Sequence, residues 1–163
     1  MPDIPLLYGD IVFDAKPDAV PYNYRISYKV TQLCLTMRIC GWGNVCSCSL
    51  IKLQMIAFAL LSRSNMRQLI EFASNTGIAP IVRFDPAVNR ALSFSIAYKF
   101  IDQQKNGSYQ LTERGKNLAD QIIQINDLMV SEISDLNELS KKLTEKKINE
   151  LVEMWRDVHV ENQ

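Results

Sequence analysis

Apolar residues recur at helical spacing from Tyr24 onward. They stand three or four positions apart, so they share one face of a helix, which carries Ile26, Val30, Leu33, Met37 and Cys40. Residues 41–44, GWGN, contain two glycines and predict the end of this helix.

A second helix is predicted over residues 50–61, and its apolar stripe is wide enough for a central core helix. The stripe consists of Leu50, Leu53, Ile56, Ala57, Leu60 and Leu61. Ser49 is placed to cap its first turn. A third helix follows, with Ser64 as its expected cap and residues 75–77 as its stop, because Gly77 can take the left-handed conformation.

Residues 78–84, IAPIVRF, are rich in β-branched side chains and predict an edge-type strand near Pro80. Asp85 and Pro86 then predict a helix start, since a carboxylate can cap the first turn and proline suits the first helical position. The inner face of this fourth helix is expected to hold Val88, Ala91, Leu92, Ser95 and Ile96.

Asn106 and Gly107 form a strong hairpin turn signal, and residues 108–111 are predicted to return as the partner strand. Thr112 is expected to cap a fifth helix whose inner face holds Leu118, Ala119, Ile122 and Ile123. Gly115 lies in the first turn of that helix, where the missing side chain lets another element approach closely.

The remaining segment, residues 127–163, stays helical and amphipathic, and Thr144 either breaks the helix or restarts it. We expect a chain of this size to be too short to cover all of the tail's apolar face from within. We therefore expect a partner protein to bind there, through Leu136, Leu139, Leu143, Ile148, Leu151 and Trp155. The alternative is a helix that packs back on the chain's own core.

Charge divides the chain into three parts, although its formal net charge is zero. Residues 1–23 carry four prolines and four aspartates, and predict an irregular acidic arm. Residues 24–126 hold 12 basic and five acidic side chains, whereas residues 127–163 hold five basic and nine acidic side chains. A basic middle can bind phosphate or an acidic protein. The longest apolar stretch is too short to span a bilayer, so we expect a cytoplasmic protein without a membrane partner.

Candidate chemistry is sparse. The four cysteines, at positions 34, 40, 46 and 48, lack the spacing of a zinc or redox motif, so buried reduced thiols are expected. The only histidine, His159, lies far from them, and no glycine-rich phosphate loop is present. We therefore expect neither an enzyme nor a cofactor, metal ion or small-molecule substrate.

One run has a more specific pattern: an Asp-Pro helix start, then Asn-Arg-Ala, then a hairpin ending in Leu-Thr-x-x-Gly, all within residues 81–119. It resembles the middle-component proteins of bacterial ABC-three-component systems and their relatives in Lamassu-type antiphage operons. The element order is also close to a winged helix. The expected fold is thus mainly α: a winged-helix domain over residues 24–126, with the arm before it and a helical extension after it.

The resemblance implies a kleisin-like accessory subunit that docks on the heads or coiled-coil base of an SMC- or Rad50-like ATPase, together with an effector, often a nuclease. About ten residues, 75–85, separate the third and fourth helices, where an ordinary winged helix has a tight turn. This departure weakens any transfer of its DNA-docking geometry.

The alternative function is a DNA-binding regulator of the MarR or PadR kind, whose fourth helix would read the major groove. The side chains that could contact phosphate or DNA are Arg90, Lys105, Asn106, Arg114 and Lys116. The simpler interpretation is that Arg90 pairs locally with Asp85 and that the hairpin turn is a solvated loop.

Overall fold

The computed structural model describes residues 25–161. Within that range the chain is mainly α, with one two-stranded antiparallel hairpin. The elements are α1 (Ile26–Cys40), α2 (Leu50–Ala59), α3 (Arg63–Ala73), α4 (Pro86–Ala97), β1 (Ile101–Gln103), β2 (Tyr109–Leu111), α5 (Glu113–Ile125), α6 (Val130–Leu139) and α7 (Glu145–Glu161). The predicted acidic arm, residues 1–23, lies outside the described residues.

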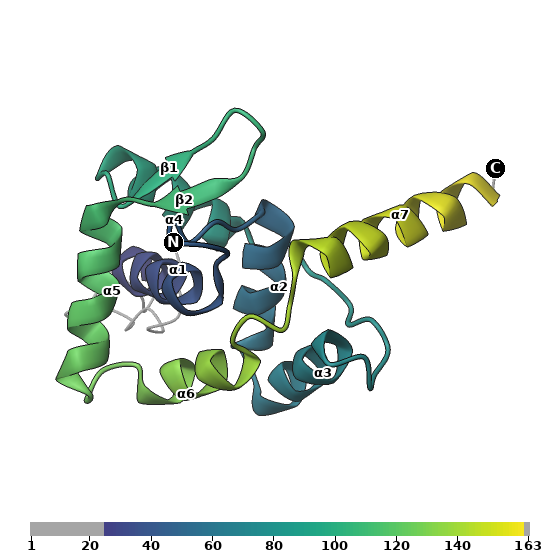
Figure 1. The fold of residues 1–163 in the computed structure, drawn as a ribbon, viewed down its shortest axis with the longest axis horizontal. Helices are drawn as coiled ribbons and strands as arrows, with labels where there is room; N and C mark the ends of the chain where they lie inside the picture. Colours follow the sequence, from purple (N-terminus) through teal and green to yellow (C-terminus); the bar gives the residue numbers. More distant parts are fainter. Residues whose placement is uncertain (1–24, 162–163) are drawn as a thin grey trace, which may run out of the picture.

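Helix α1 is the centre of the molecule. It packs against α2, α4, α5 and α6, which surround it, and the hairpin lies beside it at the top of the view (Figure 1). Its buried side chains extend well beyond one stripe and include Leu33, Cys34, Leu35 and Met37. Burial on several faces is expected for a helix enclosed by others, and each large side chain contributes about 1.5–3 kcal/mol of burial energy.

Local capping signals set most helix starts, as the sequence predicted. The Ser49 hydroxyl accepts from Lys52 N, the Asp85 carboxylate from Ala87 N, and the Thr112 hydroxyl from Gly115 N. Each such cap satisfies a backbone donor that the first helical turn leaves without a partner. Lys147 N donates to the Thr144 hydroxyl, so Thr144 restarts the chain as α7.

Two predictions around α3 were wrong in detail. Ser62, not Ser64, caps this helix, because its hydroxyl accepts from Asn65 N at 3.1 Å. The left-handed residue after the helix is Asn75, with φ of 60°, rather than Gly77. Asparagine tolerates this conformation better than most residues, since its short polar side chain can bond locally.

The predicted strand at residues 78–84 is also wrong, because this segment belongs to no strand. The Ile78 and Ile81 side chains are 91% and 76% exposed. Pro80 also has no N–H to donate to a neighbouring strand.

Both edges of β2 are paired. One edge pairs with β1, and residues 45–48 occupy the other. There, Cys48 and Tyr109 exchange backbone hydrogen bonds of 2.9 and 3.0 Å, and Leu111 N donates to Val45 O.

The hairpin turns at Asn106 and Gly107 as predicted, with Gln103 opposite Tyr109. Gly115 provides the close approach that the sequence indicated. A Cβ at this position would overlap the Phe100 carbonyl oxygen and lie 2.8 Å from Leu111 Cδ2. The missing side chain therefore lets the hairpin sit directly on the start of α5.

Helix α6 belongs to the same core, although it begins the segment predicted as an extension. Tyr28 Oη donates to Glu132 Oε1 at 2.8 Å, which joins α1 to α6. Arg63 of α3 forms ion pairs with Asp135 and Glu138 of α6. Only the later part of α7 projects from the domain (Figure 1). No helix between residues 25 and 161 combines the length and apolar character needed to cross a bilayer.

Candidate interaction surface

Two aromatic side chains stand on the outward face of α4. Phe94 is 45% exposed and Tyr98 is 56% exposed, and their rings stack with centroids 6.1 Å apart and planes 9° apart. The pair is four residues apart, which is the spacing of neighbours along one side of a helix. The opposite side of α4 is buried at Val88, Ala91 and Leu92. The amphipathic pattern therefore turns the aromatic pair toward solvent.

The aromatic pair forms one wall of a groove between α4, α1 and α5. The groove has a volume of about 360 Å³, and Phe100 continues its aromatic wall at the start of the hairpin. Ile26 and Val30 of α1 line another side, and Leu118 of α5 completes it. The groove is thus an apolar depression at the surface, of a size that protein side chains can fill.

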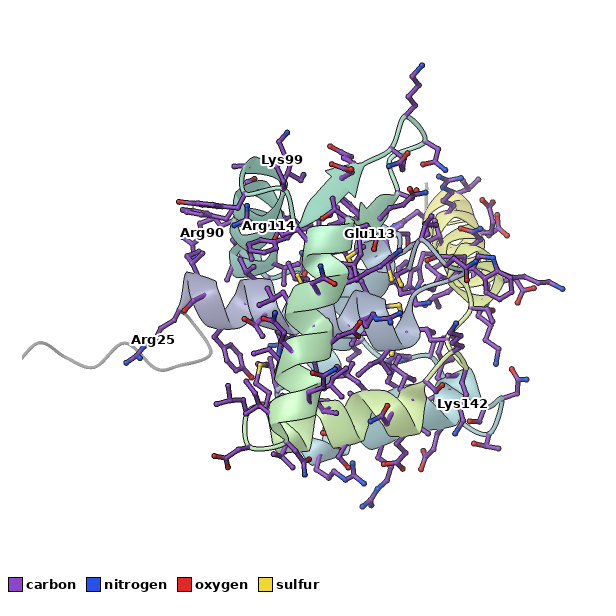
Figure 2. The ribbon with its side chains drawn as sticks, turned by 60° about the vertical axis from the view of Figure 1, so that its left-hand side comes forward. Arg25, Arg90, Lys99, Glu113, Arg114 and Lys142 are labelled. Carbon is purple, nitrogen blue, oxygen red and sulfur yellow. The ribbon has the colours of Figure 1, made fainter. Side chains whose placement is uncertain are left out.

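Basic residues surround this groove. Arg90 precedes Phe94 by one helical turn, Lys99 follows Tyr98, and the Arg114 guanidinium lies 4.7 Å from the centroid of the Phe100 ring. These three and Arg25 lie on the same side of the molecule (Figure 2). We call Phe94, Tyr98 and Phe100, with Arg90, Lys99 and Arg114, the aromatic–basic surface.

The polar side chains at the start of α4 are engaged within the chain. Asn89 Oδ1 accepts from Gln54 Nε2 at 3.3 Å, and the Ser93 hydroxyl donates to the Asn89 carbonyl at 3.1 Å. The Asp85 carboxylate contacts Ala87 N and Lys29 Nζ, at 2.8 and 3.4 Å; the predicted pairing of Asp85 with Arg90 is not among these contacts. Arg90 is exposed.

The five predicted phosphate contacts do not converge on one site. Arg90 and Arg114 belong to the aromatic–basic surface, whereas Lys105 and Asn106 are at the hairpin turn. The Asn106 side chain accepts from Ser108 N at 3.0 Å and from the Ser108 hydroxyl at 2.7 Å, so it shapes the turn itself. Lys116 pairs with Glu113 at 2.9 Å.

The apolar face of the tail is covered by the chain's own core, which corrects the expectation that the chain is too short to cover it. Residues Leu136, Leu139, Leu143, Ile148 and Leu151 are each at most 2% exposed, and Trp155 is partly buried against the same core. α6 packs on α1 and α3, and the start of α7 packs on α2. These side chains stabilise the fold and do not form an exposed face.

The far end of α7 is the exposed part of the tail. Met154 and Val158 are 61% and 58% exposed, and they continue the stripe that Leu151 begins. Its base is fixed, because Lys147 Nζ bonds to Ala73 O and to Asn75 Oδ1, and Glu145 Oε1 accepts from Ser49 N at 3.0 Å. The helix therefore leaves the domain from a firm attachment.

The cysteines are buried and unbridged, as predicted. Burial raises the pKa of the Cys34, Cys40 and Cys48 thiols to about 12, because the thiolate would lose its hydration. Among residues 25–161, no group of three or more His, Cys, Asp or Glu side chains is placed to hold a metal ion.

The sequence interpretation missed the aromatic residues at the centre of this surface. A signal was present: with Val88, Ala91, Leu92 and Ser95 facing inward, helical geometry requires Phe94 to point outward. Together with Tyr98 one turn later, Phe94 forms a contiguous exposed apolar patch, and such patches, unlike single exposed residues, can mark a contact surface. Comparisons of the chain with protein-family models, curated proteins and solved structures find no match.

Proposed function

We propose that this chain is a non-catalytic adaptor subunit that binds a larger protein through the aromatic–basic surface and the far end of α7. The observation that carries the proposal is the exposed, stacked Phe94–Tyr98 pair beside arginine side chains. Aromatic residues and arginine dominate the energetics of protein interfaces, and they do so where a pocket can exclude water. The adjoining groove supplies such a pocket.

The proposed domain type is a winged helix with one inserted helix. The order of elements along the chain supports this type, because α1, the paired segment 45–48, α2, α4 and the hairpin follow one another apart from the inserted helix. The strand arrangement also supports it, because β2 lies between β1 and residues 45–48. Helix α3 and residues 74–85 would be the insertion between the second helix and α4. In this assignment α4 takes the place of the helix that reads DNA in regulators.

The composition of α4 favours a protein partner over a DNA operator. Base edges are read by Arg, Lys, Asn and Gln side chains. On α4, Asn89 bonds to Gln54 and the exposed aromatic pair follows, which leaves Arg90 as the principal base-reading side chain. One such residue gives little sequence discrimination.

The proposed partner is an SMC- or Rad50-like coiled-coil ATPase of an antiphage defence complex, acting with a nuclease-type effector. The family resemblance of residues 81–119 suggests this class. The amphipathic end of α7 supports it, because an exposed apolar stripe at helical spacing can pack against a coiled coil. A basic surface also requires an acidic region on the partner.

The test is co-purification with the SMC- or Rad50-like ATPase that this proposal predicts to be encoded beside the chain. The Phe94→Ala, Tyr98→Ala variant should lose at least about 30-fold in affinity, since hot-spot truncation costs about 2 kcal/mol or more. Ile78→Ala is the matched control, because it removes an exposed apolar side chain from another face. Circular dichroism should show that both variants remain folded.

Two results would count against the adaptor. One is unchanged ATPase binding by the Phe94→Ala, Tyr98→Ala variant. The other is an isolated chain that forms a dimer and binds one duplex sequence with a steep salt dependence, lost in Arg90→Glu; this would establish the regulator instead.

A further inference from the structure

A second cavity, separate from the aromatic–basic surface, lies where α7 joins the domain. Its volume is about 370 Å³, within the range of small-molecule sites. The Cys40, Trp42 and Leu143 side chains provide apolar walls, and Lys52 contributes to its lining. Lys141 and Lys146 lie at its edge and are exposed.

Lys52 is an unusual residue to find there. Its side chain is buried, with 2% exposure, in the middle of the apolar helix α2. Its Nζ donates to the Cys40 carbonyl at 2.7 Å. This carbonyl ends α1, so the helix dipole, about half a charge, offsets part of the ammonium charge. The helix dipole alone does not compensate a buried ammonium, because desolvating the ammonium costs several kcal/mol.

The remaining counter-charge does not come from the described chain: among residues 25–161, no carboxylate lies within ion-pair distance of Lys52 Nζ. Glu145 also lines the cavity, but its Oε1 accepts from Ser49 N at 3.0 Å. Three lysines therefore face one glutamate that already caps α2. An ammonium has three N–H donors, and the Cys40 carbonyl uses one of them.

The charges of two lysines reach the Cys40 thiol in the cavity wall. Burial raises the pKa of the Cys40 thiol to about 12, and the positive charges of Lys52 and Lys141 oppose that rise. Both ammonium groups thus lie close enough to Cys40 to favour an anion beside it.

We propose that this cavity binds a small apolar carboxylate, whose charged group meets the Lys52 ammonium and whose hydrocarbon body packs against Trp42 and Leu143. The carboxylate supplies the counter-charge that the described chain lacks. The buried Cys40 and Leu143 side chains make the Lys52 side of the cavity apolar, which strengthens this ion pair. An uncharged ligand of the same shape gains only the hydrophobic part, and a cation is repelled.

The experiment is a fluorescence titration of the full chain with octanoate. The chain has two tryptophans, so Trp155→Phe leaves Trp42 on the cavity wall as the reporter. Octanoate should change the Trp42 fluorescence, and the change should saturate at about millimolar octanoate. 1-Octanol should bind at least about tenfold more weakly. Equal binding of the acid and the alcohol, or no saturable change with octanoate, would overturn the proposal.

Variants locate the binding. Lys52→Met keeps the length of the side chain and should weaken octanoate at least about tenfold, whereas Lys142→Gln, an exposed lysine that does not line the cavity, should not (Figure 2). Should Lys52→Met fail to fold, Lys141→Gln with Lys146→Gln provides a second test at the rim. This pair should weaken octanoate several-fold and leave 1-octanol unchanged; equal affinity for octanoate in the wild type and in the variants would refute the assignment.

Discussion

Replacing Gly115 with alanine tests how closely the hairpin sits on α5. The new Cβ would overlap the Phe100 carbonyl oxygen and come within 2.8 Å of Leu111 Cδ2 and 3.1 Å of the Phe100 carbonyl carbon. All these distances are below ordinary van der Waals contact. The leucine tip can move, but a backbone carbonyl cannot move without its chain.

The backbone at Phe100 is held from two directions. Its N–H donates to Ser95 O at 2.8 Å, and its carbonyl accepts from Thr112 N at 3.1 Å. The Thr112 hydroxyl, which caps α5, lies 2.6 Å from Lys99 O and 3.1 Å from Phe100 O. Relieving the overlap therefore strains or breaks hydrogen bonds that join α4, the hairpin and α5.

Two opposing terms set the size of the effect. Alanine is favoured over glycine within a helix by about 0.5–1 kcal/mol. Overpacking costs about 1–3 kcal/mol and is larger where backbone must shift. We expect a net loss of about 2 kcal/mol in the free energy of unfolding. For a chain of this length that corresponds to a fall in Tm of about 4–8 °C.

Urea denaturation followed by circular dichroism measures this loss. Asn117→Ala is the control, because Asn117 is exposed on the same helix and its replacement should stabilise by a few tenths of a kcal/mol. If Gly115→Ala stabilised the protein as Asn117→Ala does, the hairpin would not lie against α5 and the described packing would be wrong.

Two further predictions concern the thiols and α7. Since burial holds the pKa of Cys34, Cys40 and Cys48 at about 12, above the unfolded value of about 8.5, their contribution to stability should be complete below pH 8.5 and lost as the pH rises toward 12. At pH 8, a thiol reagent should label these cysteines slowly in the native protein and rapidly in urea; equal rates would contradict their burial. Replacing Met154 and Val158 with Asp should leave Tm nearly unchanged, because both side chains are exposed, and should weaken the ATPase binding that we propose; Leu151→Asp should instead unfold the base of α7.

Local sequence signals predicted the caps of α2, α4 and α5 and the hairpin turn, but not the cap or the stop of α3. The Ser49, Asp85 and Thr112 caps each depend on a side chain and a backbone N–H two or three residues later, so the information lies within one turn. The turn at Asn106 and Gly107 is equally local: Gly107 has a φ of 84°, which glycine adopts readily.

Features that depend on distant partners were not predictable in the same way. Residues 78–84 have the composition of a strand, but a strand also needs a partner strand, and in the described chain this segment pairs with neither β1 nor β2. The tail presents a similar difficulty. An apolar stripe at Leu136 and Leu139 has the same sequence pattern whether the chain's own α1 or another protein covers it.

Two buried polar residues, Gln54 and Lys29, hold Asp85 at the start of α4 and so support the aromatic pair as a rigid anchor. Gln54 of α2 donates through its amide to Asp85 O and accepts from Asp85 N at 2.9 Å, while Lys29 of α1 lies 3.4 Å from the Asp85 carboxylate. The central helices thus fix Asp85, the N-cap of α4, by both backbone and side chain. A buried network with its hydrogen bonds satisfied resists rearrangement, since any shift would leave polar groups without partners.

Rigidity at the start of α4 carries through to its far end, because the inner face at Val88, Ala91 and Leu92 is packed on the core. Phe94 and Tyr98 are consequently held in place before any partner arrives. Binding costs side-chain and backbone entropy in proportion to what must be ordered, and here little remains to be ordered. The exposed aromatic rings therefore have the preorganisation that the proposed contact surface requires.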